Sequence, residues 1–108
     1  MSLNTDPAIQ AYFASEAEAG VDVFETIFAS DASVTDEGKT HSGIEAIKAW
    51  KQNAKLKHQY IVEPLDSQVS NAGTAVQARL SGTFPRSSVV VAYLFGVQHG
   101  KIQTLEIN

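Results

Sequence analysis

A short run of β-branched residues ends in two neighbouring carboxylates in the segment SVTDEG, residues 33–38. A carboxylate such as Asp36, held in an apolar cavity, can act as a general base. Glu37 points to the opposite side of a strand from Asp36, so at most one of the two side chains enters such a cavity. The alternative is that Asp36 is solvated and stabilises a D-E-G turn. The residues themselves leave both interpretations open.

A histidine follows on the same segment. His41 lies five residues after Asp36, and an imidazole there can orient the carboxylate or share a proton with it. The intervening glycine and lysine favour instead a solvated histidine on a loop. His58 and His99 have no second histidine or acid at the spacing of metal ligands. We therefore predict no metal site, and the lack of a glycine-rich phosphate loop predicts no nucleotide cofactor.

Three helices are predicted in the first half of the chain, and each begins at a residue whose side chain can cap a helix. The capping residues are Asp6, Asp22 and Ser42. The first helix ends at Gly20 and carries one apolar stripe, made of Ile9, Tyr12, Phe13 and Ala17. The second, residues 23–29, forms a hairpin with the first. A polar loop over residues 36–43 then leads to the third, whose buried residues are Ile44, Ile47 and Trp50.

From residue 58 onward the apolar pattern changes from helical spacing to alternation. Four strands are predicted, over residues 58–69, 74–84, 87–98 and 101–107, and each separator has turn chemistry. They form an antiparallel meander, in which Pro64 requires an edge position or a bulge. Helices followed by such a sheet make one α+β domain that spans residues 1–108.

The composition excludes several classes of function. The chain of 108 residues has no cysteine, which rules out disulfides and thiolate sites. Twelve acidic residues against eight basic ones make nucleic acid an improbable partner. The lysines of the third helix, Lys48, Lys51, Lys55 and Lys57, are predicted to form a solvated face. No segment is typical of a membrane span or a secretory signal, so we predict a cytoplasmic protein with no membrane partner.

The order of elements and the segment FASDASVTDEGKTHSGIEAIKAW, residues 28–50, resemble the nuclear transport factor 2-like superfamily, and within it the SnoaL-like branch. The residues that carry the resemblance are Phe28, Asp31, Ala32, Asp36, Gly43, Ile47 and Trp50. The resemblance implies a cone-shaped α+β half barrel, in which three N-terminal helices pack on a curved antiparallel sheet. It also implies a mainly apolar cavity, no cofactor, and a homodimer formed through the sheet.

The same resemblance assigns roles to individual residues. In the ketosteroid isomerases of this superfamily an acid matching Asp36 moves the proton, and a tyrosine matching Tyr12 donates a hydrogen bond to the oxyanion. Their third position falls near Tyr93, which is no carboxylic acid. We expect the cavity to be lined by Phe13, Phe28, Trp50, Val91 and Phe95. The alternative role for Tyr12 and Tyr93 is to fill the core.

Three functions follow. The first is an enzyme that binds a small apolar carbonyl compound and uses Asp36 as general base, with Tyr12, and Tyr93 or His41, as hydrogen-bond donors. The second is a binding module for a small hydrophobic ligand, without catalysis. The third is a structural or interaction domain whose cavity is filled by its own aromatic residues, namely Phe13, Phe84, Phe95 and Tyr93.

Overall fold

The computed structural model describes residues 6–16, 22–57, 60–71, 73–82 and 88–107, with residues 55–57 described by their backbone only. The helices are α1 (Pro7–Ser15), α2 (Phe24–Ile27) and α3 (Ile44–Lys57). The strands are β1 (Phe28–Asp36), β2 (Lys39–Ser42), β3 (Tyr60–Ser70), β4 (Gly73–Gly82), β5 (Val89–Gln98) and β6 (Lys101–Ile107). The predicted α+β class is confirmed.

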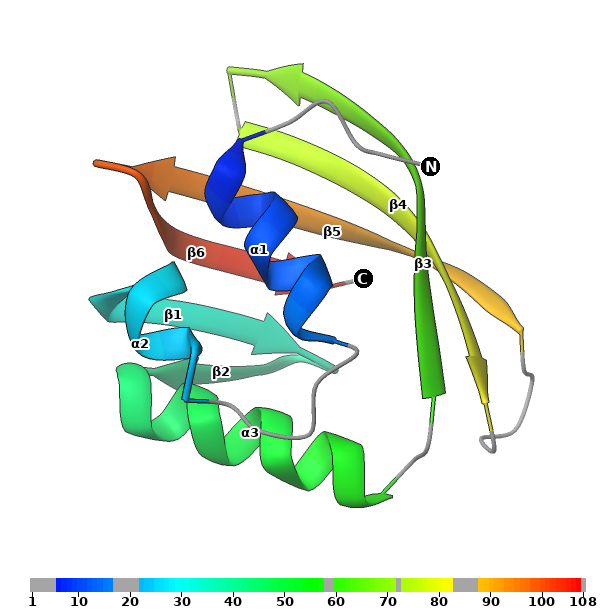
Figure 1. The fold of residues 1–108 in the computed structure, drawn as a ribbon, viewed down its shortest axis with the longest axis horizontal. Coiled ribbons are helices and arrows are strands. Elements are labelled where there is room, and N and C mark those ends of the chain that lie inside the picture. Colours follow the sequence, from blue (N-terminus) through cyan, green and yellow to red (C-terminus); the bar gives the residue numbers. More distant parts are fainter. Residues whose placement is uncertain (1–5, 17–21, 58–59, 72, 83–87, 108) are drawn as a thin grey trace.

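The strands form one curved sheet in the order β2-β1-β6-β5-β4-β3 (Figure 1). The meander β3-β4-β5-β6 is antiparallel, as predicted. The sheet as a whole is mixed, however, because β1 pairs with β6 in the parallel direction. Alternation of apolar residues carries no information about strand direction, so the prediction of a purely antiparallel sheet was wrong at this pair.

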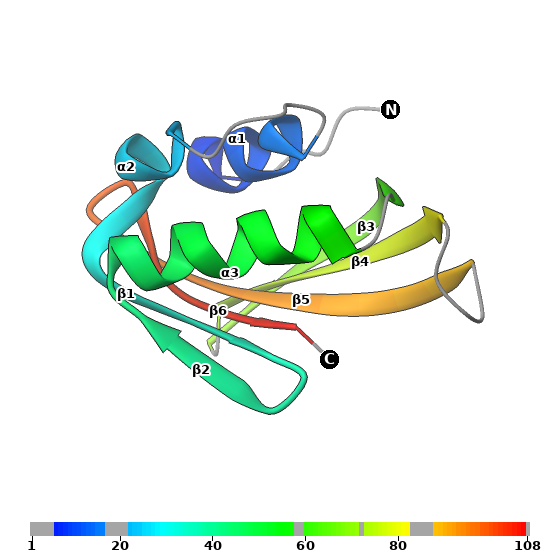
Figure 2. The ribbon, with the colours of Figure 1, turned by 90° about the horizontal axis from the view of Figure 1, so that it is seen from below.

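The helices all lie on one side of the sheet, where its curvature wraps toward them (Figure 2). Their apolar faces meet the inner face of the sheet in a single core. Its largest fully buried side chains include Tyr12, Phe24, Phe28 and Phe95. No helix in the described part of the chain is long and apolar enough to cross a membrane.

The helix starts follow the predicted caps in one case out of three. The Asp6 carboxylate accepts a hydrogen bond from the amide of Ala8 at 2.9 Å, and Pro7 is the first helical residue, as predicted. Asp22 caps nothing, since α2 begins after Val23 and has no side-chain cap. Helix α3 begins one residue later than Ser42 would require. The predicted end of the first helix, Gly20, lies outside the described residues.

The predicted polar loop over residues 36–43 is instead a β-hairpin. Asp36 is the last residue of β1 and pairs with Lys39, the first of β2. Glu37 and Gly38, with φ of 53° and 77°, form the two-residue turn between them. We missed β2 because its sequence, KTHS, has no apolar residue to reveal alternation. The D-E-G segment therefore ends a strand and also makes a turn.

Pro64 lies in β3, which is an edge strand, and the pairing of β3 with β4 shifts register between Pro64 and Asp66. Both predicted solutions for this proline are present, since it cannot donate a hydrogen bond to a neighbouring strand. Tyr60 and Val62, which lie two residues apart before the bulge, both face the core side of β3.

Candidate functional site

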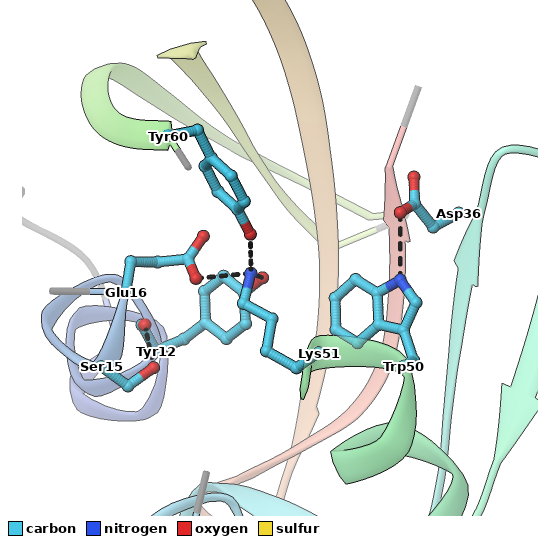
Figure 3. A network of polar contacts seen from close by, with 7 residues as sticks. All are labelled: Tyr12, Ser15, Glu16, Asp36, Trp50, Lys51 and Tyr60. Atoms are coloured by element: carbon cyan, nitrogen blue, oxygen red, sulfur yellow. Dashed lines mark hydrogen bonds and ion pairs between the residues drawn. The ribbon is translucent and has the colours of Figure 1, made fainter. Parts of the chain in front are cut away.

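Asp36 ends β1 at the rim of the core and is half-buried. Its Oδ2 accepts a hydrogen bond from the indole Nε1 of Trp50 at 3.0 Å, while Oδ1 has no hydrogen bond with another described residue (Figure 3). Val34, two residues earlier on the same face of β1, is fully buried. Asp36 therefore lies on the inner face of the sheet, held through one carboxylate oxygen.

His41 is positioned by the hairpin. It pairs with Val34 across β1 and β2, so it lies diagonally from Asp36 on the inner face. Its ring centroid is 6.1 Å from that of Trp50. The hydrogen-bond partner of Asp36 is Trp50, so His41 is its neighbour beside the indole and not its direct partner.

Tyr12 is completely buried on α1. Its ring contacts the core aromatics, with centroid distances of 5.6 Å to Phe95 and 6.1 Å to both Phe28 and Tyr93. Its hydroxyl oxygen lies 3.4 Å from Nζ of Lys51. Tyr12 thus fills the core, which was the alternative role predicted for it. It also places a hydroxyl group in the interior, which a role as hydrogen-bond donor requires.

Lys51 corrects the prediction of a solvated lysine face, because it is only 2% exposed. Its ammonium forms an ion pair with Glu16 and donates hydrogen bonds to the hydroxyls of Tyr60, at 2.9 Å, and of Tyr12 (Figure 3). The same nitrogen lies 5.1 to 5.4 Å from the ring centroids of Trp50, Tyr12 and Tyr60, within the range of cation–π attraction. Lys48, by contrast, forms an exposed ion pair with Glu25.

Sequence reasoning missed three residues of this cluster, namely Glu16, Lys51 and Tyr60. The signal for two of them was helical spacing. Lys51 is seven residues after Ile44 and four after Ile47, so it shares their buried face. Glu16 is four residues after Tyr12 and shares its face of α1. The meeting of α1, α3 and β3 at this point is a tertiary contact that no local pattern shows.

Glu16 is the least satisfied member of the cluster. Its side chain is 5% exposed, and its Oε1 makes the ion pair with Lys51. This contact with the ammonium satisfies Oε1, whereas Oε2 has no hydrogen-bond partner within the described residues. One buried acceptor, Oε2, is therefore left without a donor among the described residues.

The electrostatics of the cluster follow from burial. Burial, followed by the negative charge of Glu16, raises the pKa of Tyr12 well above its ordinary value, and the same two causes raise the pKa of Tyr60 and Tyr93. All three phenols stay protonated and can donate hydrogen bonds. Burial lowers the pKa of Lys51, and the Glu16 carboxylate opposes this change. The charge of Asp36 also acts on these four groups.

Tyr93 and the residues expected to line a cavity all belong to the core or contact it. Tyr93 stacks on Phe95 at 6.2 Å, and its ring meets that of Phe13 edge-on at 5.3 Å. Its hydroxyl forms no hydrogen bond with another described residue. Phe28, Trp50 and Phe95 are buried, whereas Phe13 and Val91 are partly buried against them. Their role as pocket lining stays a prediction.

The arrangement offers the Asp36 carboxylate, one oxygen of which has no partner among the described residues, together with several phenol donors and the Lys51 ammonium around one apolar interior. These groups suit proton transfer next to a carbonyl. Within the described residues, no three His, Asp or Glu side chains are grouped so as to hold a metal ion.

The chain is similar to several proteins of known structure. The sequence matches no family model and no functionally curated protein. A solved protein from Sinorhizobium meliloti, provisionally assigned as a polyketide cyclase, is 37% identical and superposes with a TM-score of 0.94. The similarity covers 100% of this chain and 99% of that one.

Two more distant structures share the fold. A provisionally assigned SnoaL-like polyketide cyclase from Jannaschia sp. CCS1 is 17% identical with a TM-score of 0.81, over 99% of this chain and 90% of that one. A protein with a ketosteroid isomerase-like fold from Catenulispora acidiphila, solved in complex with trimethylamine, is 20% identical with a TM-score of 0.78. That similarity covers 96% of this chain and 86% of the other.

Proposed function

The chain belongs to the SnoaL-like branch of the nuclear transport factor 2-like superfamily, and from this premise we propose that it is a small cofactor-independent enzyme. Its substrate is a small, mainly apolar carbonyl compound, and its reaction is an acid/base step of the isomerase or cyclase kind. Asp36 is the general base and Tyr12 the main hydrogen-bond donor.

The observation that carries this proposal is the way Asp36 is held. Trp50 binds one carboxylate oxygen at 3.0 Å, which fixes the orientation of the group, and the second oxygen has no partner among the described residues. A general base needs this combination, because it must be positioned and must also have a lone pair for the proton that it removes. A carboxylate that only stabilised the hairpin turn would not require an indole from α3.

In the proposed reaction Asp36 removes a proton from the substrate and later returns it. Asp36 takes a proton from the carbon next to the substrate carbonyl, and the electron pair of that C–H bond moves toward the carbonyl oxygen to give an enolate. A phenol hydroxyl of the interior donates a hydrogen bond to this oxygen. In an isomerisation, a C=C bond conjugated with the enolate lets Asp36 return the proton to a carbon further along the conjugated system, and the double bond moves. In a cyclisation, the enolate carbon attacks a second carbonyl and Asp36 returns its proton to the new alkoxide.

A second candidate function is favoured by the close aromatic packing. Phe13, Tyr93 and Phe95 make edge-on and stacked contacts at 5.3 to 6.2 Å in the region expected to hold a ligand. An interior filled by its own side chains fits a structural or interaction domain. The binding-module alternative lies between the two, since it needs a cavity but no base.

The test does not require the natural substrate to be known. The protein is mixed in D₂O with a panel of small cyclic ketones and 1,3-diketones, and NMR follows the loss of hydrogen next to the carbonyl. We expect faster exchange with the native protein, and loss of this acceleration in Asp36→Asn, with the urea midpoint of the variant measured to verify folding. No acceleration by the native protein, or equal acceleration by Asp36→Asn, contradicts the proposal.

We also propose that the chain forms a homodimer through the outer face of the sheet. Support comes from two large apolar side chains there, Ile61 on β3 at 73% and Val90 on β5 at 49% exposure. Sedimentation of the native protein and of Ile61→Lys tests this. A dimer that the variant weakens supports it, and a monomeric native protein at micromolar concentration contradicts it.

A further inference from the structure

The interior retains an ion pair where apolar residues of similar volume would be at least as stable. Both partners are buried, and Oε2 of Glu16 has no hydrogen-bond donor within the described chain. The pair is therefore poorly arranged for stability alone, since a buried pair is favourable only when its remaining polar atoms are satisfied. A buried polar group left in this state points to a role in function.

The direction of the hydrogen bonds around Lys51 leaves two phenol protons unused. An ammonium group has three donors and no lone pair, so the hydroxyls of Tyr12 and Tyr60 must accept from it. Each hydroxyl keeps its own O–H proton, and no described residue accepts either of them. Both oxygens lie within 3.4 Å of the same nitrogen. Two donors are thus gathered around one positive charge.

We propose that Lys51 is a positioning residue that makes the Tyr12 and Tyr60 hydroxyls a site for an anionic oxygen of the enolate or phenolate class. Lys51 holds both hydroxyls by their lone pairs, so that their protons are free for the ligand. Its charge also makes each O–H a stronger donor. Glu16 fixes the ammonium and partly offsets its charge. This inference rests on the proposed function, because the enolate that Asp36 generates is the anion to be bound.

The charges of Lys51 and Glu16 predict opposite changes in anion binding when each is removed. Proton transfer moves one negative charge from Asp36 to the substrate oxygen, which then faces Lys51 and Glu16. Removal of Lys51 leaves that oxygen beside a negative group, while removal of the Glu16 charge leaves it beside a positive one. A purely structural ion pair predicts the same direction for both variants, because each breaks the same contact.

The experiment uses 4-nitrophenol as the probe, because the absorption spectrum distinguishes its phenolate from its neutral form. Bound 4-nitrophenol is titrated with the native protein, Lys51→Met and Glu16→Gln. We expect the native protein to bind the phenolate preferentially, Lys51→Met to weaken phenolate binding about tenfold or more, and Glu16→Gln to strengthen it by a similar factor. Binding of 4-nitroanisole, which cannot ionise, should change little.

Tyr60→Phe provides a milder variant if Lys51→Met does not fold, since it removes one hydroxyl and keeps the ring. It should also weaken phenolate binding about tenfold. The inference is overturned if the native protein binds no phenolate, if it prefers the neutral phenol, or if both charge variants change phenolate binding in the same direction. Ketone exchange that depends on Asp36 without phenolate preference overturns this inference alone. Phenolate preference without ketone exchange overturns the proposed function and leaves the anion site.

Discussion

Replacement of either member of the Glu16–Lys51 pair should strongly destabilise the fold, and the two replacements should differ in size. The side chains of Lys51 and Glu16 are 3% and 5% exposed, so solvent screens their interaction little. Removing one partner of such a pair costs about 3–5 kcal/mol. Glu16→Gln leaves the ammonium with two hydroxyl acceptors and three aromatic rings. Lys51→Met leaves a carboxylate with no hydrogen-bond partner in the described part of the chain.

We therefore expect about 3 kcal/mol for Glu16→Gln and about 5 kcal/mol for Lys51→Met. At roughly 4 °C per kcal/mol for a domain of this size, the melting temperature falls by about 12 and 20 °C. The double variant removes both charges together and should lie within about 1 kcal/mol of the native protein. The coupling energy from this double-mutant cycle is then several kcal/mol.

The assay is urea unfolding followed by the fluorescence of Trp50, the single tryptophan of the chain, whose ring centroid lies 5.1 Å from the Lys51 nitrogen. Circular dichroism on the same samples verifies that one transition is observed. Costs below about 1 kcal/mol for both single variants are typical of a solvent-exposed pair and would refute the reasoning. A double variant less stable than either single variant would do so as well.

Three further predictions concern the pH dependence of stability, the hydrogen bond between Trp50 and Asp36, and a turn. The buried phenols with raised pKa are those of Tyr12, Tyr60 and Tyr93. They remain protonated in the folded state, so above pH of about 10, where they ionise in the unfolded chain, each removes about 1.4 kcal/mol of stability per pH unit. Lys51, with its lowered pKa, acts in the opposite direction below about pH 10. Urea midpoints from pH 8 to 11 should fall above pH 10, and phenolate absorbance should appear only with unfolding. Trp50→Phe removes the donor to Asp36 and should cost about 1.5 kcal/mol in urea unfolding, an unchanged midpoint being the contrary result. Gly73→Ala should cost about 3 kcal/mol, because φ is 129° and the added Cβ would lie 2.3 Å from the Phe95 carbonyl oxygen. Gly100→Ala, with φ of 78° and open space, should cost only about 1 kcal/mol, and equal melting temperatures for the two would contradict this.

The meander was predictable because the apolar residues of its strands alternate and the sequence between the strands contains glycine, asparagine or proline. Strand β2 was not, since its four polar residues have no pattern. Asp36 at a strand end was also predictable, but its hydrogen bond to Trp50 joins β1 to α3 and depends on packing.

Lys51 shows where sequence reasoning failed although a signal was present. Its spacing from Ile44 and Ile47 indicated the buried face of α3, but a lysine is so seldom buried that we assigned it to solvent. Burial of the Lys51 ammonium is possible only because Glu16, at the end of α1, and Tyr60, on β3, contact it. Burial of a charge is thus a property of the assembled interior.

The parallel pairing of β1 with β6 also bears on how the protein folds. Asp36 pairs with Ile107, so the strand that carries Asp36 is fixed from one side by a segment near the other end of the described chain. Closing so long a loop is entropically costly, and contacts of this kind form late and slow the folding rate. During synthesis the helices and β1 emerge well before β6. The meander can grow by local hairpins in the meantime, and Asp36 reaches its final position only when the last strand joins the sheet.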